Sequence, residues 1–467
     1  MALTVIEKIW ADHVVASVSP DEDLLFIDRV LMHERTGPQL LEGLRSAGRR
    51  PAYKGMDFGV VDHIVDTSPD RSATDIRGRA AEFIPRLREL TAEAGIQLFD
   101  VDDPRQGIVH VMSPELGIAL PGCTLVCADS HTCTVGGIGA LAWGIGSTEG
   151  EHAVATQTLV KRRPKLMQVR LTGQLQPGVT AKDMALAIIA RFGQEGANGC
   201  AVEFCGDAVR ALEVEARMTL CNMAAEFGAF TAVVAPDEKT IDWVRGRPFA
   251  PKGQAMEAAA AHWRTLFSDA GAKWDVSATV DISDVKPQVT WGISPYMGVA
   301  IDESVPDPAT LDESRREFAN RALRYMALQP GQPMAGIPIE AAFIGSCTNS
   351  RLSDLRMAAQ VVQGRKVAPG VLAIVIPGSM QVRAAAEAEG LDRVFLEAGF
   401  EWRASGCSLC VYNGSDSFRG ARRVVSTTNH NFENRQGPGV QTHLASPATV
   451  AASAVAGCIA DPRPLLG

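Results

Sequence analysis

The stretch Ala341-Ala-Phe-Ile-Gly-Ser-Cys-Thr-Asn-Ser-Arg351 runs from four apolar residues into a polar loop with one cysteine. Such a short apolar run is typical of a strand buried on both faces of a parallel sheet. A later loop, Gly406-Cys-Ser-Leu-Cys410, adds two cysteines. Structural zinc and electron-transfer iron–sulfur sites usually have four protein ligands, whereas a metal held by three keeps a position for a hydroxyl or carboxylate. Cys347, Cys407 and Cys410 therefore indicate a catalytic metal centre.

Three further segments repeat this order of a short strand-like run followed by polar residues. They are Phe58–Val61 before Asp62-His63, Thr124–Ala128 before Asp129-Ser130-His131, and Arg423–Ser426 before Asn429-His430-Asn431. In doubly wound α/β sheets, ligands bind beyond the carboxyl ends of the strands. We therefore expect the four loops to border one crevice.

The chain length and its breaks predict several domains. The 467 residues, 46% of them apolar, can bury two to four cores. Lys161-Arg-Arg-Pro164 and the turn-rich stretch 281–308 interrupt the pattern, so we expect α/β domains at 1–165, 166–285 and 286–467. Between them, a helix is expected from Thr180 to Phe192, with Asp183 in a capping box and Gly193 as its stop.

Charge and composition exclude other classes. A net charge of -9 argues against nucleic-acid or membrane-surface binding. No secretory signal or bilayer-spanning stretch is evident, so we expect a cytoplasmic protein. We also expect the remaining cysteines to be buried thiols. They are Cys123, Cys127, Cys133, Cys200, Cys205, Cys221 and Cys458.

The glycine-rich run 136–146 does not have the spacing of a dinucleotide or Walker loop. Close helix packing, or a backbone cradle for a carboxylate, suits it better. Acid and histidine occur together in Asp62-His63 and Asp129-Ser130-His131, and Asn222 and Glu226 share one face if that segment is helical. Carboxylate–imidazole pairs set the tautomer and pKa of a histidine for proton transfer.

These motifs resemble the aconitase superfamily, and within it the large subunits of bacterial 3-isopropylmalate dehydratases. The resemblance extends from Glu7 to at least Pro447, and it implies three α/β domains with mostly parallel, doubly wound sheets around a central cluster cleft, without the swivel domain. The matching stretches are Ile27-Asp-Arg29, Gln106-Gly-Ile-Val-His-Val-Met112, Cys127-Ala-Asp-Ser-His-Thr132, Gly146-Ser-Thr-Glu149, Met218-Thr-Leu-Cys-Asn-Met223, Gln288-Val-Thr-Trp-Gly292, Gly345-Ser-Cys-Thr-Asn-Ser-Arg351 and Arg435-Gln-Gly437.

The resemblance implies a [4Fe-4S] cluster, one per subunit, on Cys347, Cys407 and Cys410, with one iron left for the substrate. The reaction is then the interconversion of 2- and 3-isopropylmalate in leucine biosynthesis by dehydration and rehydration. The implied catalytic residues are Asp62 with His63 as the acid, His110 with Asp129, and His131 with Glu226. The implied substrate-binding residues are His33, Ser130, Asn222, Asn429, His430 and Arg435.

The resemblance also implies a partner. The family's base is a serine in a Gly-Ser-Ser-Arg loop on a swivelling domain, and this chain has no such sequence. We expect a separate small subunit to carry it, so that this chain alone is inactive. The other expected ligand is a small hydroxy-dicarboxylate, with neither nucleic acid nor membrane as a partner.

Three departures from the family pattern leave the substrate open. His430 stands where an arginine is usual, Val411-Tyr-Asn-Gly414 replaces Leu-Ala-Met-Asn, and Asp62-His-Ile-Val-Asp-Thr67 differs from Asp-His-Asn-Val. Because imidazole binds anions differently from guanidinium, the alternative is a paralogous hydro-lyase for another 2-substituted malate, such as citramalate, dimethylmalate or a homocitrate-like acid. An electron-transfer protein, a cluster-free RNA-binding regulator and a structural zinc protein are the alternatives from other classes.

Overall fold

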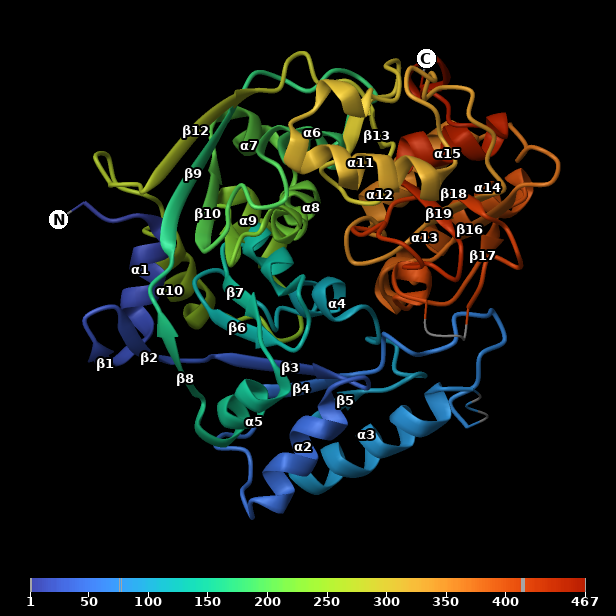
Figure 1. Ribbon diagram of the computed structural model, residues 1–467. Helices are drawn as coiled ribbons and strands as arrows, with labels where there is room; N and C mark the ends of the chain where they lie inside the picture. The colour runs from blue at the N-terminus through green and yellow to red at the C-terminus, as the bar shows by residue number, and fades with distance from the viewer. Residues whose placement is uncertain (1, 75, 77, 413–415, 467) are drawn as a thin grey trace. The chain divides into compact units, whose positions relative to one another are not determined.

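The computed structural model describes residues 2–74, 76, 78–412 and 416–466. The chain forms two compact units (Figure 1). Unit 1 comprises residues 1–64, 72–173 and 195–281, and unit 2 comprises 65–71, 174–194 and 282–467. Each of the three expected domain ranges contains most of one larger parallel sheet, while the domain division itself stays a prediction.

The first sheet of unit 1 has the order β5-β4-β3-β6-β7, and all its strands are parallel. Every residue of β4 and β6 is buried, as their apolar runs predict. Both predicted strands are confirmed to within a residue at each end. The strands are β3 (Arg29–His33), β4 (Asp57–Val60), β5 (Gln97–Phe99), β6 (Thr124–Cys127) and β7 (Leu141–Gly144).

Helices cover both faces of this sheet. Leu31 of β3 joins a core with α4 (Val109–Glu115), the 3₁₀ helix η1 (Thr132–Ile138) and α8 (Val214–Met223). Since neighbouring side chains of a strand alternate in direction, Met32 points the other way, where it lies near Gly37 of α2 (Gly37–Ser46). Around α2 lie α3 (Ala80–Ala94) and α5 (Ser147–Thr156). Figure 1 shows α2 and α3 side by side beneath β3 and β4.

A second parallel sheet in unit 1 has the order β11-β10-β9-β12. Its strands are β9 (Lys165–Thr172), β10 (Cys200–Cys205), β11 (Thr231–Val233) and β12 (Val276–Asp281). The antiparallel strands β1 (Val14–Ser19), β2 (Glu22–Phe26) and β8 (Thr158–Arg162) form a small third sheet. The unit's other helices are α1 (Val5–His13), α7 (Asp207–Ala211), η2 (Ala224–Phe227), α9 (Glu238–Val244) and α10 (Gln254–Trp263).

The glycine-rich run packs closely, as one of the two sequence interpretations predicts. A Cβ on Gly136 would lie 1.8 Å from the carbonyl oxygen of Ala232, and one on Gly137 would lie 2.4 Å from the backbone nitrogen of Met218. Any larger residue would push η1 away from β11 and α8. The two glycines therefore allow η1, the helix that follows Asp129 and His131, to pack directly against β11 and α8.

Unit 2 contains the parallel sheet β17-β16-β15-β18-β19. The predicted strands 341–344 and 423–426 are confirmed residue for residue as β15 and β18, and they are neighbours. The carboxyl ends that precede Cys347 and Asn429 therefore lie side by side. The strands are β15 (Ala341–Ile344), β16 (Leu372–Val375), β17 (Glu401–Trp402), β18 (Arg423–Ser426) and β19 (Gln441–Leu444).

Helix α15 (Pro447–Ala456) contacts β15 and β18, and α12 (Leu352–Val362) contacts α15, α13 (Met380–Ala388) and α14 (Leu391–Ala398). The predicted helix 180–192 is confirmed as α6 (Ala181–Phe192), because Asp183 accepts from the Thr180 backbone N–H at 2.9 Å and Gly193 caps the other end. The remaining elements are β13 (Gln288–Thr290), β14 (Gly298–Ala300), α11 (Glu313–Met326), η3 (Pro308–Thr310), η4 (Ser408–Cys410) and η5 (Arg463–Leu465).

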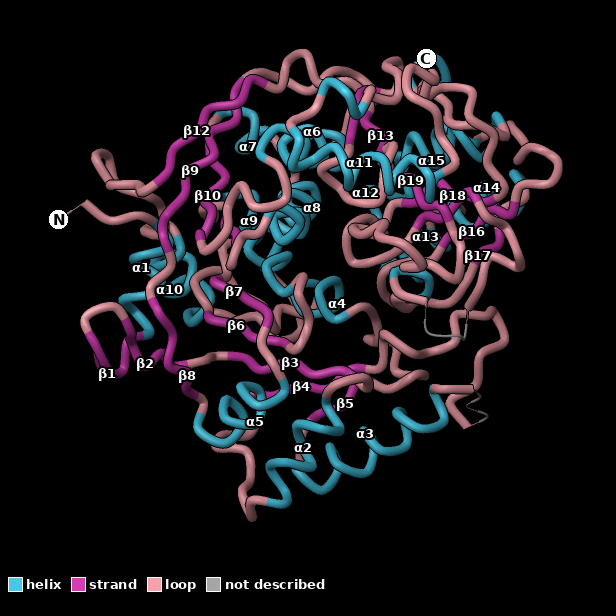
Figure 2. Tube along the Cα trace, viewed as in Figure 1, coloured by secondary structure: helices cyan, strands magenta, loops and turns pink. Residues whose placement is uncertain are grey.

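Figure 2 shows helices and strands mixed throughout both units, as expected of an α/β protein. Within the described ranges, a membrane-crossing helix of sufficient length and apolarity does not occur.

Candidate functional site

The predicted site residues are divided between the two units. Those of unit 1 are His33, Asp62, His63, His110, Asp129, Ser130, His131, Asn222 and Glu226, and those of unit 2 are Cys347, Cys407, Cys410, Asn429, His430 and Arg435. Within each unit, most of these residues come from loops at the carboxyl ends of parallel strands.

In unit 1, His63 lies between two carboxylates. Its Nδ1 is 2.6 Å from Asp62 Oδ1, and its Nε2 is 3.0 Å from Asp129 Oδ2. Burial opposes a charge on this ring, but the negative charge of Asp62 and the hydrogen bonds to both carboxylates outweigh it, so that the pKa of His63 is raised well above its usual value. Each ring nitrogen thus faces a carboxylate oxygen, an arrangement that favours the protonated imidazolium.

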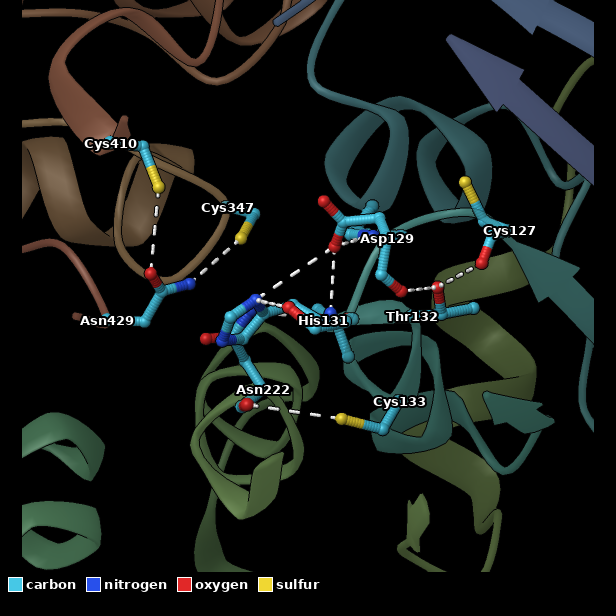
Figure 3. A network of polar contacts seen from close by, with 12 residues as sticks. Cys127, Asp129, His131, Thr132, Cys133, Asn222, Cys347, Cys410 and Asn429 are labelled. Atoms are coloured by element: carbon cyan, nitrogen blue, oxygen red, sulfur yellow. Dashed lines mark hydrogen bonds and ion pairs between the residues drawn. The ribbon is translucent and has the colours of Figure 1, made fainter. Parts of the chain in front are cut away.

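Asp129 joins His63 to the other two histidines. Its Oδ1 is 2.9 Å from His110 Nε2 and accepts from the His131 backbone N–H at 2.8 Å (Figure 3). Burial opposes ionisation of Asp129, but its hydrogen bonds to His110 and His63 lower its pKa well below the usual value. His131 Nε2 lies 2.7 Å from Glu226 Oε1. All three expected acid–histidine pairs are therefore in contact.

The polar residues around this network are held by neighbours. Ser130, which is exposed, lies 3.1 Å from His131 Nδ1 through its Oγ. The buried Asn222 donates from Nδ2 to Thr134 Oγ1 at 2.7 Å, and its backbone oxygen contacts Cys133 (Figure 3).

His33 stacks on His63, with ring centroids 3.9 Å apart. Burial and the charge on His63 lower the pKa of His33 to about 3, so it is neutral. Its Nε2 contacts the Ala128 carbonyl oxygen at 3.2 Å, which makes this nitrogen the donor. Its buried Nδ1 has no hydrogen-bond partner among the described residues. The Nδ1 lone pair of His33 can therefore accept a hydrogen bond beside His63.

The sequence interpretation missed Glu34. This buried carboxylate accepts from the backbone N–H of Asp62 at 3.0 Å and also from that of Ile64. It therefore holds the loop on both sides of His63. Burial, followed by the charge of Asp62, raises the pKa of Glu34 to about 7. Only its position beside His33 could have suggested a role.

In unit 2, the three predicted ligands are all buried, with exposures of 4% for Cys347, 3% for Cys407 and 6% for Cys410. The amide of Asn429 lies between two of them: its Nδ2 donates to Cys347 Sγ at 3.4 Å, and its Oδ1 lies 3.6 Å from Cys410 Sγ (Figure 3). Cys407 and Cys410 belong to one turn, in which the Cys410 N–H donates to the Cys407 carbonyl oxygen at 3.0 Å.

The spacing of these sulfurs can be compared with what a single zinc ion requires. A single zinc ion binds thiolates at about 2.3 Å, so three of them would lie roughly 4 Å apart. Within the described ranges, the three cysteine sulfurs do not form a group whose members all lie within 4.8 Å of one another. A donor set of three separated thiols fits a multi-iron cluster, in which each sulfur binds its own iron.

The two cysteine loops contain backbone that non-glycine residues rarely adopt. Ser346, before Cys347, has φ 77°, and Ser408, after Cys407, has φ 47°. Such conformations persist where surrounding contacts enforce them, often at functional sites. Here Ser408 Oγ donates to Asp416 Oδ2 at 2.5 Å, and Leu409 is buried in the core with Phe343.

The other predicted residues of unit 2 adjoin these loops. Arg435 Nε donates to the Cys410 carbonyl oxygen at 2.7 Å, and its guanidinium lies over the Phe432 ring. His430 is half-buried, and its ring also contacts Phe432, with centroids 5.7 Å apart. Of the divergent segment 411–414, Tyr412 is 39% exposed, while Asn413 and Gly414 lie outside the described residues.

Two buried cations near the cysteine loops were also missed. Arg351 donates through Nη2 to the Cys347 carbonyl oxygen at 3.0 Å and through Nη1 to that of Thr348 at 2.9 Å. Lys182 donates to the carbonyl oxygens of Thr427 at 3.3 Å and Thr428 at 2.7 Å, directly before Asn429. Their charges gave no sequence signal, because arginine and lysine are usually on the surface.

Of the seven cysteines expected to be buried thiols, Cys127, Cys133, Cys200 and Cys221 are buried, whereas Cys123, Cys205 and Cys458 are partly exposed. Burial raises the pKa of Cys123 and of Cys133 to about 12, so that they stay protonated thiols.

Three comparisons relate the chain to known proteins. The sequence profile of the aconitase family (aconitate hydratase) matches residues 7–457. The chain is 51% identical over 461 residues to the 3-isopropylmalate dehydratase large subunit 1 of Bradyrhizobium diazoefficiens, covering 98% of this chain and 96% of that protein. The crystal structure of holo aconitase X from Thermococcus kodakaraensis matches with a TM-score of 0.46 and 13% identity, over 87% of this chain and 84% of that one.

Proposed function

Since this chain belongs to the aconitase family, we propose that it is the large, iron–sulfur subunit of an isomerase that interconverts 2- and 3-isopropylmalate in leucine biosynthesis. The observation that carries the proposal is the 51% identity to a 3-isopropylmalate dehydratase large subunit over nearly the whole of both chains. The three buried cysteines and the carboxylate–histidine network support the same hydro-lyase chemistry.

Cys347, Cys407 and Cys410 would hold a [4Fe-4S] cluster. When bound, this group supplies Lewis-acid stabilisation to a departing hydroxyl. Asn429 would hydrogen-bond to the ligand sulfurs or to the substrate. Arg435 donates from Nε to the Cys410 carbonyl oxygen. Its Nη groups would then bind a substrate carboxylate.

His63 would be the acid that protonates the leaving hydroxyl. Asp62 fixes its Nδ1, so the proton on Nε2, which is held against Asp129, is the one to be transferred. His110 and His131, with Asp129 and Glu226, would keep the network oriented. The Nδ1 lone pair of His33 would accept from a substrate hydroxyl, with Ser130 and Asn222 as further polar contacts.

The carbon-bound proton requires a base that these residues do not supply. We propose that a small subunit provides a serine in a Gly-Ser-Ser-Arg loop on a swivelling domain, so that turnover needs both chains. The name of the Bradyrhizobium relative as a large subunit supports such a partner.

A second candidate is a hydro-lyase for another 2-substituted malate, and His430 favours it. This half-buried ring follows Asn429 directly, where the family pattern has an arginine. An imidazole is shorter than a guanidinium and lacks its fork of donors.

The test is turnover by the chain reconstituted anaerobically with a small subunit carrying the Gly-Ser-Ser-Arg loop, on isopropylmalate, citramalate, dimethylmalate and homocitrate. The proposal predicts the highest kcat/KM for isopropylmalate and no turnover by either chain alone. A preference for another malate would replace the main proposal by the second candidate.

A further inference from the structure

Arg351 is a fully buried cation whose guanidinium forms no ion pair with any described carboxylate. Its side chain is 1% exposed. Within the part of the chain that the structure describes, its side chain donates to two backbone carbonyl oxygens, and its Nε has no hydrogen-bond partner. Taking a guanidinium out of water without a counter-charge costs several kcal/mol, so such groups are rarely kept unless something offsets the charge.

The position of this cation shows what can offset it. The carbonyl that Nη2 binds belongs to Cys347 itself, and the one that Nη1 binds belongs to the next residue. Three thiolates and inorganic sulfide would bring an excess of negative charge to this loop once a cluster is bound. A group with that charge is the complement that Arg351 lacks.

The same contacts fix the geometry of the loop. Ser346 has φ 77°, so the backbone before Cys347 is held in a conformation that it would leave if it were free to relax. The two Nη groups of the Arg351 guanidinium donate to the carbonyl oxygens of Cys347 and Thr348, so that one side chain holds both backbone groups. The backbone N–H of Arg351 donates to Asp354 Oδ2 at 3.0 Å, which anchors the residue to the first turn of α12.

We propose that Arg351 is a positioning residue of the cysteine centre: it holds Cys347 through the backbone and supplies the positive charge that balances the anionic cluster. The inference rests on the proposed function only in requiring the cluster. It makes no claim about the substrate or the partner.

Two variants separate the two roles. Arg351→Lys keeps the charge but loses the two-pronged contact, and Arg351→Gln keeps amide donors but loses the charge. Arg356→Gln is the matched control, because Arg356 lies on α12, which begins directly after Arg351, is 52% exposed and pairs with Glu389 at the surface. The measurements on the anaerobically reconstituted chain are the rate of iron loss to a chelator and the reduction potential of the cluster.

Both Arg351 variants should lose iron faster, by about 10- to 100-fold for Arg351→Gln, as is usual when a group that orients a metal ligand is removed. The potential should move to more negative values in Arg351→Gln, because the reduced, more negative cluster loses its neighbouring cation, and should stay near the wild-type value in Arg351→Lys. Arg356→Gln should change neither quantity.

An unchanged rate of iron loss in Arg351→Lys would overturn the positioning role, and an unchanged potential in a folded Arg351→Gln would overturn the role of the charge. If Arg351→Gln does not fold, Arg351→Lys decides alone: faster iron loss at an unchanged potential supports the proposal, and a shifted potential contradicts it. A wild-type chain that binds no iron and sulfide would instead refute the proposed function.

Discussion

Glu34→Gln tests whether the Glu34 carboxylate holds the loop that carries His63. The Glu34 carboxylate is buried and accepts two backbone N–H groups from the loop that carries this histidine. Burial raises its pKa from 4.5 to about 7. The folded chain therefore keeps a proton that the unfolded chain loses between these values, and the free energy of unfolding falls as the pH rises through this window.

The size of the effect follows from the shift. Each pKa unit corresponds to 1.36 kcal/mol, so ionisation of Glu34 should remove about 3 kcal/mol of stability between roughly pH 4.5 and pH 7. Glutamine cannot ionise. Relative to the wild type, the variant should gain about 3 kcal/mol on going from pH 5 to pH 8, while at pH 5 it should be slightly less stable, because its amide nitrogen cannot accept a backbone N–H.

The assay is urea denaturation of the wild type and the variant at pH 5 and pH 8, with hydrogen exchange of the Asp62 and Ile64 amides as a local measure. Glu93→Gln is the control, since Glu93 is half-exposed in a surface pair with Arg45 that contributes at most about 1 kcal/mol. If the stability difference between wild type and Glu34→Gln were the same at both pH values, the reasoning about Glu34 would be wrong.

Three further substitutions test other parts of the account. Asp129→Asn should move the alkaline limb of the pH profile of kcat/KM to lower pH by about one unit or more. The reason is that the substitution removes a charge and a hydrogen bond that raise the pKa of His63. If the limb did not move, His63 would not be the acid. Leu409→Ala should cost about 2–5 kcal/mol of stability and speed iron loss, since Leu409 is fully buried and lies in sequence between the proposed ligands Cys407 and Cys410. Leu396→Ala, at a side chain 54% exposed, should change stability by about 0.5 kcal/mol at most. Equal effects of the two substitutions would exclude an anchoring role for Leu409. His430→Arg should change the ranking of malates by kcat/KM, and an identical ranking would show that His430 does not contact the substrate.

The strands could be predicted because their signals are local. Four apolar residues followed by polar ones mark β15, and the capping residues Thr180 and Asp183 mark α6. The Asp62–His63 pair could be predicted for the same reason, because its members are neighbours in sequence.

Contacts between distant segments gave no such signal. His63 and Asp129 are both visible as candidates, yet nothing in the sequence shows that they touch. Glu34 and Lys182 act through backbone groups of other loops, and Arg351 acts through carbonyl oxygens of its own loop. Any polar side chain of suitable length could reach such groups, so the residue type alone gives no signal. Asp416 accepts a hydrogen bond from Ser408 Oγ, and Ser408 has a positive φ; the sequence signals neither feature.

The central claim is a cluster on Cys347, Cys407 and Cys410 with one iron left to the substrate. Mössbauer spectra of the chain, reconstituted with enriched iron and its small subunit, test it directly. Isopropylmalate should change the Mössbauer signal of one iron in four, and Cys347→Ser should abolish the signal of the cluster. A signal that no malate changes, or a mononuclear metal without sulfide, would contradict it.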